Sequence, residues 1–285
     1  MLETHVPEDS AGVATAAFGD GRQVAYAEYG APGGDAVLAL HGTPGSRRLW
    51  ERFDDEARRS GVRLLAPDRP GYGRSPPWPE RTLADTAPLT AVLDDAGVTE
   101  AHVLGFSGGA PHALGLAATV PERVRSVHVV AGAVPPSFGA EKPRLLRAID
   151  TLALRAPRFL RGALRVQTAM LRYAPPSAVA TQYTNREDDL PEELAAAVAR
   201  DYRSALSRSR QGFVTETQLL ADEWDFDPAG TENPVMFYHG DRDDNVPLDG
   251  ARRFADAVGS ELTVLDGADH LGTLVRAVPS VLESV

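Results

Sequence analysis

Short apolar runs recur along the chain and predict the strands of one sheet. Residues 36–40 are all apolar, as is typical of a strand that is covered on both faces of a parallel sheet. Residues 23–29 alternate in the manner of a half-buried strand. Similar runs follow at residues 63–66, 101–106, 127–130, 235–238 and 262–265.

Helix-like segments lie between these runs, at residues 50–60, 83–96, 110–120 and 251–258. Strands that alternate with helices predict an α/β fold with a largely parallel sheet. In such sheets the functional residues lie in loops after the carboxyl ends of the strands. Candidate chemistry is therefore expected in those loops.

One long interval, from Pro135 to about Pro228, contains no strand pattern and is rich in Arg, Leu and Ala. It is either a separate helical domain or a helical insertion that covers the sheet. We favour the insertion because both flanks return to strands of one sheet, and long insertions in α/β enzymes tend to be binding elements. This interpretation divides the chain into a core of residues 1–135 and 229–285 and a cap of residues 136–228.

The composition is that of one sizeable ordered domain, with 285 residues, 43% hydrophobic and 24% charged. The net charge is −11, and no concentrated basic patch with aromatic residues stands out. We therefore expect neither a nucleic-acid partner nor a membrane partner. The oligomeric state stays open.

The absence of cysteine excludes disulfides, thiolate metal sites and cysteine nucleophiles, and leaves the redox compartment open. The first nine residues are acidic and lack a signal-peptide pattern. No apolar run approaches the ~20 residues that span a bilayer. We expect a cytoplasmic protein, and the excess of Arg over Lys together with abundant Ala suggests a GC-rich bacterial genome.

The segment Gly105–Gly109 reads G-F-S-G-G between a predicted strand and a predicted helix. This is the layout of a nucleophile elbow, in which glycines allow a sharp turn that exposes the serine hydroxyl. Backbone N–H groups at the start of the helix then face the reaction centre. The pattern predicts Ser107 as a nucleophile, although three fixed positions also occur by chance in ordinary turns.

A serine nucleophile needs a base, and histidine suits this role because its pKa lies near neutrality. Of seven histidines, His270 is the best candidate, since it follows the last predicted strand in the loop 266–272. We expect His41 to brace its own loop. The others are placed in a tail, in strands or on the helix after the serine: His5, His102, His112, His128 and His239.

The acid that orients the base is expected between Ser107 and His270, in the turn after residues 235–238. Asp243 fits best, and Asp241 is the next choice. Asp-rich turns are usually only solvated, so this assignment competes with a structural one. Asp269 is expected to point away from His270 into solvent.

Two N–H donors are needed to stabilise a developing oxyanion. The first is the N–H of Gly108, directly after the nucleophile. The second is the N–H of Thr43, in the loop His41-Gly42-Thr43-Pro44-Gly45-Ser46, where Gly42 permits close approach and Pro44 restricts the preceding residue. A Gly/Pro surface turn explains this loop equally well.

Five blocks together resemble the α/β-hydrolase superfamily: residues 41–45, 68–75, 105–109, 240–247 and 269–270. The resemblance covers the chain from about residue 20 to its end. It implies an eight-stranded, mostly parallel sheet with a helical cap inserted after the sixth strand, where residues 136–228 fall. It also places Asp68–Ser75 in a turn near the pocket, which we interpret as structural.

This resemblance implies a cofactor-independent serine hydrolase without a metal, acting through an acyl-enzyme on a small to medium ester, thioester or lactone, or on a C–C bond. Relatives that open epoxides or displace halide use an aspartate nucleophile, which Ser107 excludes. The alternatives are a lyase, cyclase or acyltransferase, a binding protein that uses the hydrolase pocket, and a prolyl aminopeptidase.

Two sets of cap residues bear on these alternatives. The aminopeptidases typically carry Gly in place of Thr43 and use cap acids to hold the substrate amine. The acids available for that purpose are Glu187, Asp188, Asp189, Glu192 and Glu193. We expect at most half of the following aromatic residues to line the pocket: Phe138, Tyr173, Tyr183, Tyr202, Phe213 and Trp224.

Overall fold

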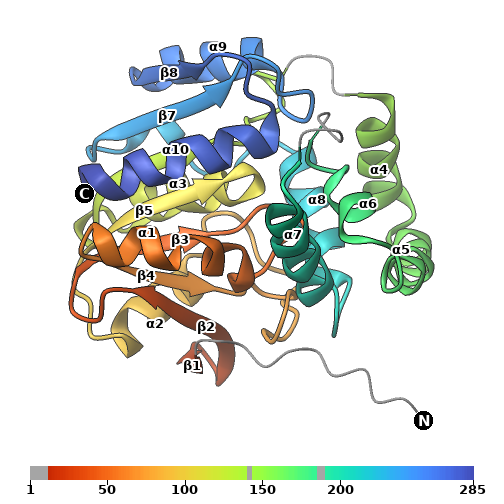
Figure 1. Cartoon of the computed structure of the whole chain (residues 1–285), viewed down its shortest axis with the longest axis horizontal. Helices are drawn as coiled ribbons and strands as arrows, with labels where there is room; N and C mark the ends of the chain where they lie inside the picture. Colours follow the sequence, from red (N-terminus) through yellow and green to blue (C-terminus); the bar gives the residue numbers. More distant parts are fainter. Residues whose placement is uncertain (1–11, 140–142, 185–189) are drawn as a thin grey trace.

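The computed structural model describes residues 12–139, 143–184 and 190–285. Its eight strands form one sheet in the order β1-β2-β4-β3-β5-β6-β7-β8 (Figure 1). The strands are β1 (Val13–Phe18), β2 (Arg22–Gly30), β3 (Asp35–Leu40), β4 (Val62–Pro67), β5 (Ala101–Phe106), β6 (Val124–Val130), β7 (Val235–Gly240) and β8 (Glu261–Leu265).

The sheet is mostly parallel, as the sequence predicts. Only β2 runs against its neighbours, since it pairs antiparallel with both β1 and β4. All other neighbours are parallel. Strand β1 has no counterpart among the predicted apolar runs because its six residues include three alanines and a threonine.

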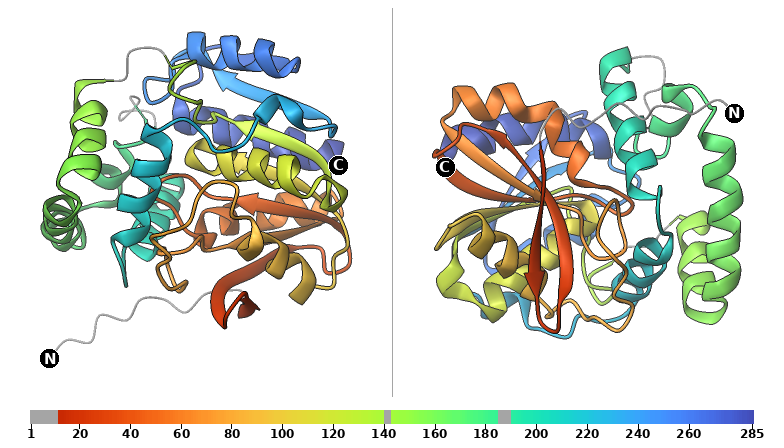
Figure 2. Two further views of the ribbon diagram at one scale, coloured as in Figure 1. Left: turned by 180° about the vertical axis from the view of Figure 1, so that it is seen from behind. Right: turned by 90° about the horizontal axis from the view of Figure 1, so that it is seen from below.

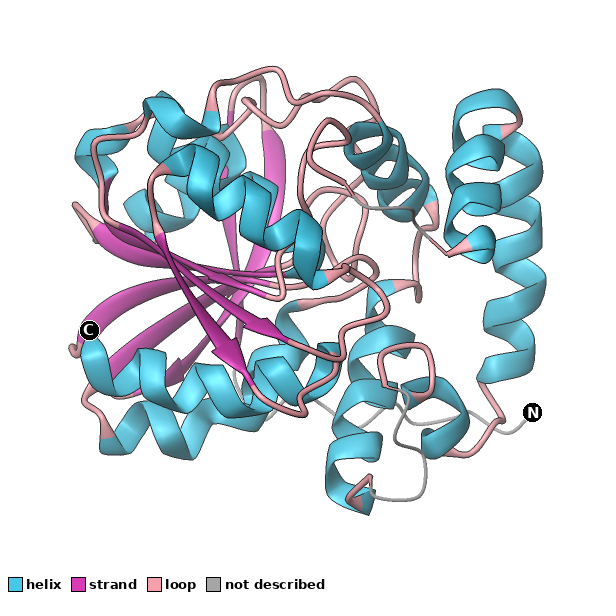
Figure 3. Ribbon diagram, turned by 90° about the horizontal axis from the view of Figure 1, so that it is seen from above, coloured by secondary structure: helices cyan, strands magenta, loops and turns pink. Residues whose placement is uncertain are grey.

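Two hydrophobic clusters lie on opposite faces of the sheet, because side chains alternate along each strand. On β3, Leu38 and Leu40 join one cluster, whereas Val37 and Ala39 join the other. Helices α2 (Ala87–Asp95), α3 (Ala110–Thr119) and α9 (Leu248–Val258) cover the first face, and η1 (Arg47–Phe53), α1 (Asp54–Arg59) and α10 (His270–Ser284) cover the second (Figure 3).

Two helices differ from the sequence-based expectation. The helix predicted at residues 83–96 begins only at Ala87, because Pro88 fits the first turn of a helix and not its interior. Helix α10 was not predicted, although its buried side chains recur with helical spacing. Its first residue is His270, which therefore lies at a helix N-terminus and not within a loop.

Between β6 and β7 the chain forms a helical insertion, as predicted, at one end of the sheet (Figure 2). Its helices are α4 (Arg144–Arg155), α5 (Pro157–Leu171), α6 (Pro176–Ala180), α7 (Glu192–Ala205) and α8 (Gln211–Ala221). Two small buried clusters hold these helices to one another. We call this insertion the cap.

Two further features concern only the described ranges 12–139, 143–184 and 190–285. No helix within them is both long and apolar enough to cross a membrane. Nor do they contain a group of three or more His, Cys, Asp or Glu side chains that could hold a metal ion.

Candidate active site

Ser107 stands at the sharp turn between β5 and α3. Its φ of 52° lies in the left-handed region, which non-glycine residues seldom adopt without compensation from the surrounding structure. The residues on both sides of it are buried, whereas Ser107 itself is partly exposed. The turn thus presents this side chain at the carboxyl end of the central strands.

The glycines around Ser107 are required by close backbone approaches. A Cβ atom on Gly105 would lie 2.6 Å from the Cα atom of Ala110. A Cβ atom on Gly109 would lie 2.4 Å from the carbonyl oxygen of Leu40. Both distances are far shorter than van der Waals contact, so the G-x-S-x-G pattern is dictated by the packing of β5, α3 and β3.

The structure brings His270 and Asp243 together. The Nδ1 atom of His270 lies 2.7 Å from Oδ2 of Asp243, and the two residues are only 3% and 5% exposed. The other carboxylate oxygen, Oδ1, accepts the backbone N–H groups of Asn245 and Val246, each at 2.9 Å. Of the two candidate acids, Asp243 is therefore the one that meets the histidine, and Asp241 is exposed.

Asp243 remains ionised despite its burial. Burial raises the pKa of this carboxyl, but the imidazole of His270 and the hydrogen bonds to the carboxylate outweigh it and leave the pKa below its usual value. A second imidazole, that of His239, has its Nε2 atom 3.5 Å from Oδ2. Burial lowers the pKa of His239, and its Nε2 atom also lies 2.8 Å from the carbonyl oxygen of Val246.

The imidazole of His270 packs against the nucleophile elbow. Its ring centroid lies 5.0 Å from that of Phe106, the residue before Ser107. A polar pocket of about 20 Å³ beside His270 is lined by the turn after α6, the loop after β7 and the start of α10, and it has room for one water molecule. The predicted nucleophile, base and acid thus lie at one edge of the sheet.

The expectation for Asp269 is wrong, because this residue is only 4% exposed. It is the N-cap of α10, and its Oδ1 atom accepts the N–H of Gly272 at 2.7 Å. Its Oδ2 atom accepts a hydrogen bond from the hydroxyl of Thr184 in the cap. An N-cap aspartate fixes the start of a helix, so Asp269 determines where His270 begins α10.

The two predicted oxyanion-hole residues lie against each other. A Cβ atom on Gly108 would be 2.2 Å from Oγ1 of Thr43. A Cβ atom on Gly42 would be 3.3 Å from Cβ of Ser107. The loop after β3 therefore passes directly beside the elbow. A Cβ atom has no room at Gly108, and at Gly42 it would fit only if its neighbours shifted by a few tenths of an ångström.

Glu216 of α8 lies at the centre of a buried charged cluster that was not predicted from the sequence. Its carboxylate accepts a hydrogen bond from Thr43 Oγ1 at 2.6 Å. Arg69 binds both carboxylate oxygens, at 2.7 and 2.8 Å. Arg81 and His112 lie 3.0 and 3.2 Å from Oε1. The cluster joins the cap to the loop beside Ser107.

This cluster carries an excess of positive charge. Burial raises the pKa of Glu216, but Arg69 and the other partners outweigh it and hold the pKa well below its usual range. Burial lowers the pKa of His112 to about 4, so this imidazole is neutral at pH 7. Two guanidinium groups therefore face one carboxylate, with side-chain exposures of 2% or less.

The segment Asp68–Ser75 is structural, as expected, and it supports the loop after β3. The side chain of Arg69 donates hydrogen bonds to the carbonyl oxygens of His41 and Gly42. The Arg69 N–H donates to Nε2 of His41 at 3.2 Å. His41 thus braces this loop, as predicted. Burial, followed by the nearby Arg69 charge, lowers the pKa of His41 well below its usual value.

Among the aromatic residues offered as pocket walls, Tyr183 has the most direct link to the site. Its hydroxyl donates to the carbonyl oxygen of Pro44 at 2.8 Å, and its carbonyl oxygen accepts the N–H of Leu271 at 3.0 Å. Tyr173 is 79% exposed and faces away. The other four pack into the core or the interior of the cap: Phe138, Tyr202, Phe213 and Trp224.

The cap acids give little support to an amine-binding site. Glu187, Asp188 and Asp189 lie outside the described residues, and Glu192 and Glu193 are exposed on α7. Among the described residues, Asp201 and Glu216 are cap carboxylates that contact the loop after β3. Ser46 donates to Asp201, and Glu216 is already engaged by two arginines.

Comparisons with known proteins identify the family and the fold. A family model described as alpha/beta hydrolase fold matches residues 35–277. The chain is 28% identical over 254 residues to a dihydrolipoyllysine-residue acetyltransferase component of the acetoin cleaving system of Pseudomonas putida, covering 88% of this chain and 62% of that protein. It spans between 34% and 62% of the length of the two such components that it matches.

A lipase, LipV of Mycobacterium tuberculosis, is 27% identical over 200 residues, which cover 69% of this chain and 68% of that protein. Among solved structures, an esterase from Exiguobacterium antarcticum has a TM-score of 0.71 with 21% identity, and the match covers 95% of this chain and 96% of the esterase. At this identity the structural likeness concerns the fold alone.

Proposed function

Because this chain belongs to the alpha/beta hydrolase fold family, we propose that it is a serine hydrolase acting through an acyl-enzyme on a small to medium ester, thioester or lactone. The same machinery supports hydrolysis of an activated C–C bond. The observation that carries the proposal is the buried Asp243–His270 pair, with 2.7 Å between Oδ2 and Nδ1, packed against the elbow that presents Ser107.

In the proposed mechanism the hydroxyl of Ser107 attacks the substrate carbonyl carbon while Nε2 of His270 accepts the hydroxyl proton. Asp243 accepts the Nδ1–H hydrogen bond, which fixes the tautomer and stabilises the imidazolium. His270 then returns the proton to the leaving group. In the second half a water molecule gives a proton to His270 while its oxygen bonds to the acyl carbon. The bond from that carbon to Ser107 Oγ then breaks, His270 returns the proton to Oγ, and the acid is released.

The oxyanion of each tetrahedral intermediate is proposed to accept the N–H groups of Thr43 and Gly108. Arg69 supports this role by binding the carbonyl oxygens that precede Thr43 in the loop. The excess positive charge of the cluster around Glu216 lies directly behind the same loop. In a buried environment such a fixed charge favours a developing anion more than it would in water.

A second candidate function is acyl transfer to a thiol or alcohol in place of water. It is favoured by the relative named as an acetyltransferase component, since the alignment with that protein, at 28% identity, covers 88% of this chain. In this reaction the acceptor S–H or O–H gives its proton to His270 and its heteroatom bonds to the acyl carbon. The bond from that carbon to Ser107 Oγ then breaks, and His270 returns the proton to Oγ. The first half-reaction is the same.

The test is turnover of p-nitrophenyl esters of short and medium acyl length, with and without added thiol. A hydrolase releases one free acid per p-nitrophenol whether or not thiol is present. An acyltransferase forms a thioester at the expense of the acid. Failure to release p-nitrophenol from any ester above the rate of Ser107→Ala would contradict both functions.

A further inference from the structure

The outer face of the cap exposes large apolar side chains that the fold does not use. Within the described ranges, all but one of the exposed large hydrophobic residues lie on α4, α5 or the turn that follows: Leu145, Leu154, Phe159, Val166, Met170 and Tyr173. The exception is Val264 on β8. Helices α4 and α5 form the edge of the molecule farthest from the sheet (Figures 1 and 3).

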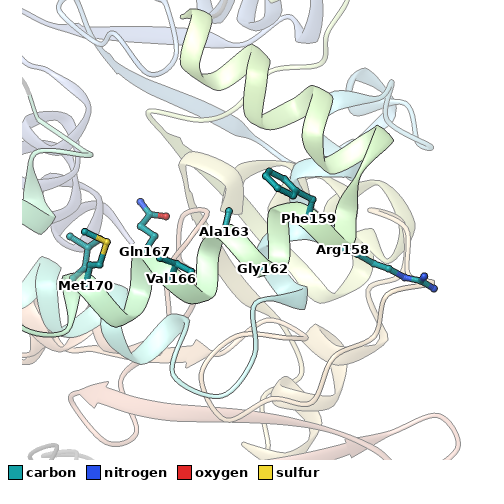
Figure 4. A pocket seen from close by; sticks show the side chains of 8 residues that line it. Arg158, Phe159, Gly162, Ala163, Val166, Gln167 and Met170 are labelled. Atoms are coloured by element: carbon teal, nitrogen blue, oxygen red, sulfur yellow. The ribbon is translucent and has the colours of Figure 1, made fainter.

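Helix α5 is apolar on two sides. Its inner side, with Leu160 and Leu164 only 4% and 6% exposed, packs against the rest of the cap. On its outer side Phe159, Val166 and Met170 are 67%, 63% and 71% exposed. These residues and Ala163 follow one another at intervals of four, three and four, which places them on one face. They line a surface pocket along the helix (Figure 4).

A row of arginines runs beside this apolar stripe. Arg158, Arg165 and Arg172 directly precede Phe159, Val166 and Tyr173, so both rows repeat every seven residues. None of the 40 acidic residues of the chain lies between positions 151 and 186. In a chain with a net charge of −11, helix α5 and the turn after it thus carry arginines and no carboxylate.

We propose that the outer face of α5 docks on an anionic lipid surface, with the apolar stripe inserted among the acyl chains and the arginines at the phosphate groups. A helix that combines exposed Phe, Val and Met with a row of arginines has the pattern of an interfacial helix. Each basic residue near an anionic membrane strengthens binding. This inference does not rest on the proposed enzymatic function.

The charge pattern favours lipid over a second copy of the chain. A symmetric contact would set this basic face against itself, and no carboxylate on the facing helix would pair with the arginines. The stripe follows a helix about 22 Å long and about 10 Å wide, so its face covers roughly 220 Å². This area is well short of the roughly 800 Å² per partner that a stable dimer buries. The negative net charge of the chain does not decide whether this face binds an anionic membrane. Salt screens charges beyond about 8–10 Å, so the arginines of this face act on lipid largely independently of distant carboxylates.

The experiment is co-sedimentation of the full chain with vesicles of phosphatidylcholine alone and with vesicles of equal parts phosphatidylcholine and phosphatidylglycerol. We expect binding to the anionic vesicles, weakening as salt is raised, and little binding to the neutral ones. Equal binding to both compositions, or none to either at low salt, overturns the proposal. The salt titration uses the unmodified chain and needs no variant.

Vesicle binding by single variants tests whether the outer face of α5 is the binding surface. Arg165→Gln is expected to lower the partition coefficient on anionic vesicles about five-fold, and Met170→Ser about ten-fold. Their matched controls are Arg252→Gln on α9 and Val264→Ser on β8, exposed positions on the core, which are expected to leave binding unchanged. Thermal unfolding midpoints verify that all four variants fold.

Two further outcomes would contradict the proposal. Light scattering that finds a dimer which Met170→Ser dissociates assigns the face to a second copy. Binding to a polyanion such as heparin as tightly as to anionic vesicles, and with no loss in Met170→Ser, assigns the arginines to a soluble polyanion.

Discussion

The hydroxyl of Thr43 in the core and the carboxylate of Glu216 in the cap share a hydrogen bond of 2.6 Å across 173 positions of sequence. This contact joins helix α8 of the cap to the loop beside Ser107. If the oxyanion hole is formed as proposed, Glu216 is a positioning residue for it.

Glu216→Gln is expected to lower both stability and turnover. The change leaves the buried Arg69 and Arg81 without their counter-charge, which costs about 3 kcal/mol or more of unfolding free energy. In the fraction that folds, kcat on a soluble ester should fall at least ten-fold with a smaller change in KM, because the loop loses its brace. Urea unfolding and steady-state kinetics measure the two effects.

The control is Glu192→Gln on the exposed start of α7, which should change neither quantity. Thr43→Ser, which keeps both the hydroxyl and the N–H, should retain most activity, whereas Thr43→Val should not. Wild-type kcat in folded Glu216→Gln would contradict the positioning role.

Asp243→Asn is expected to reduce kcat by about four orders of magnitude, since an amide no longer holds the imidazole in the reactive tautomer. Asp241→Asn serves as the control because Asp241 lies in the same turn but is exposed. Ester hydrolysis by both variants tests the assignment. If Asp241→Asn were the inactive one, the acid would be misidentified.

Asp201 of α7 provides a pH-dependent link between cap and core. Its Oδ1 atom accepts the N–H and the hydroxyl of Ser46 at 2.8 and 2.7 Å. Burial raises the pKa of Asp201 to about 7. Between about pH 4 and pH 7 the folded chain keeps this proton while the unfolded chain loses it, so this residue's contribution to stability falls as pH rises.

Asp201→Asn removes this ionisation and keeps the acceptor oxygen. Relative to wild type, the variant should gain up to about 4 kcal/mol of unfolding free energy on going from pH 4 to pH 7. Urea unfolding of both proteins across that range measures the difference. A difference that does not change with pH would show that Asp201 has an ordinary pKa.

Asp269→Ala should cost about 1 kcal/mol of stability through loss of the N-cap of α10. It should also lower kcat, because His270 is the first residue of that helix and its position depends on the cap. Asp269→Asn keeps an acceptor for the N–H of Gly272 and should retain most of both properties. Equal losses in the two variants would point to the charge of Asp269 and not to its capping.

Much of the fold follows from local pattern. The apolar runs place seven of the eight strands because each is short, apolar and bounded by turn residues, including the largely exposed β8. Strand β1 was not predicted because it is a short, alanine-rich strand at the end of the sheet. The start of α10 could also be predicted from the sequence, because an aspartate stands directly before a periodic apolar segment, which is typical of a helix N-terminus.

Some residues of the candidate site can likewise be predicted from the sequence, and others cannot. Ser107, His270 and Asp243 could be nominated because each follows a strand and the family order is fixed. Glu216 could not, since its partners lie 104 to 173 positions away and a glutamate within a helix usually faces solvent. Only the packing of α8 onto the loops after β3 and β4 reveals its role.

Covalent labelling with a fluorophosphonate is the most direct test of whether Ser107 is an activated nucleophile. We expect one label per wild-type chain, located on Ser107 by peptide mass spectrometry and absent from Ser107→Ala. Labelling of Asp243→Asn should be much slower, since the base is no longer oriented. A wild-type chain that does not react, or a label that persists in Ser107→Ala, would contradict the account.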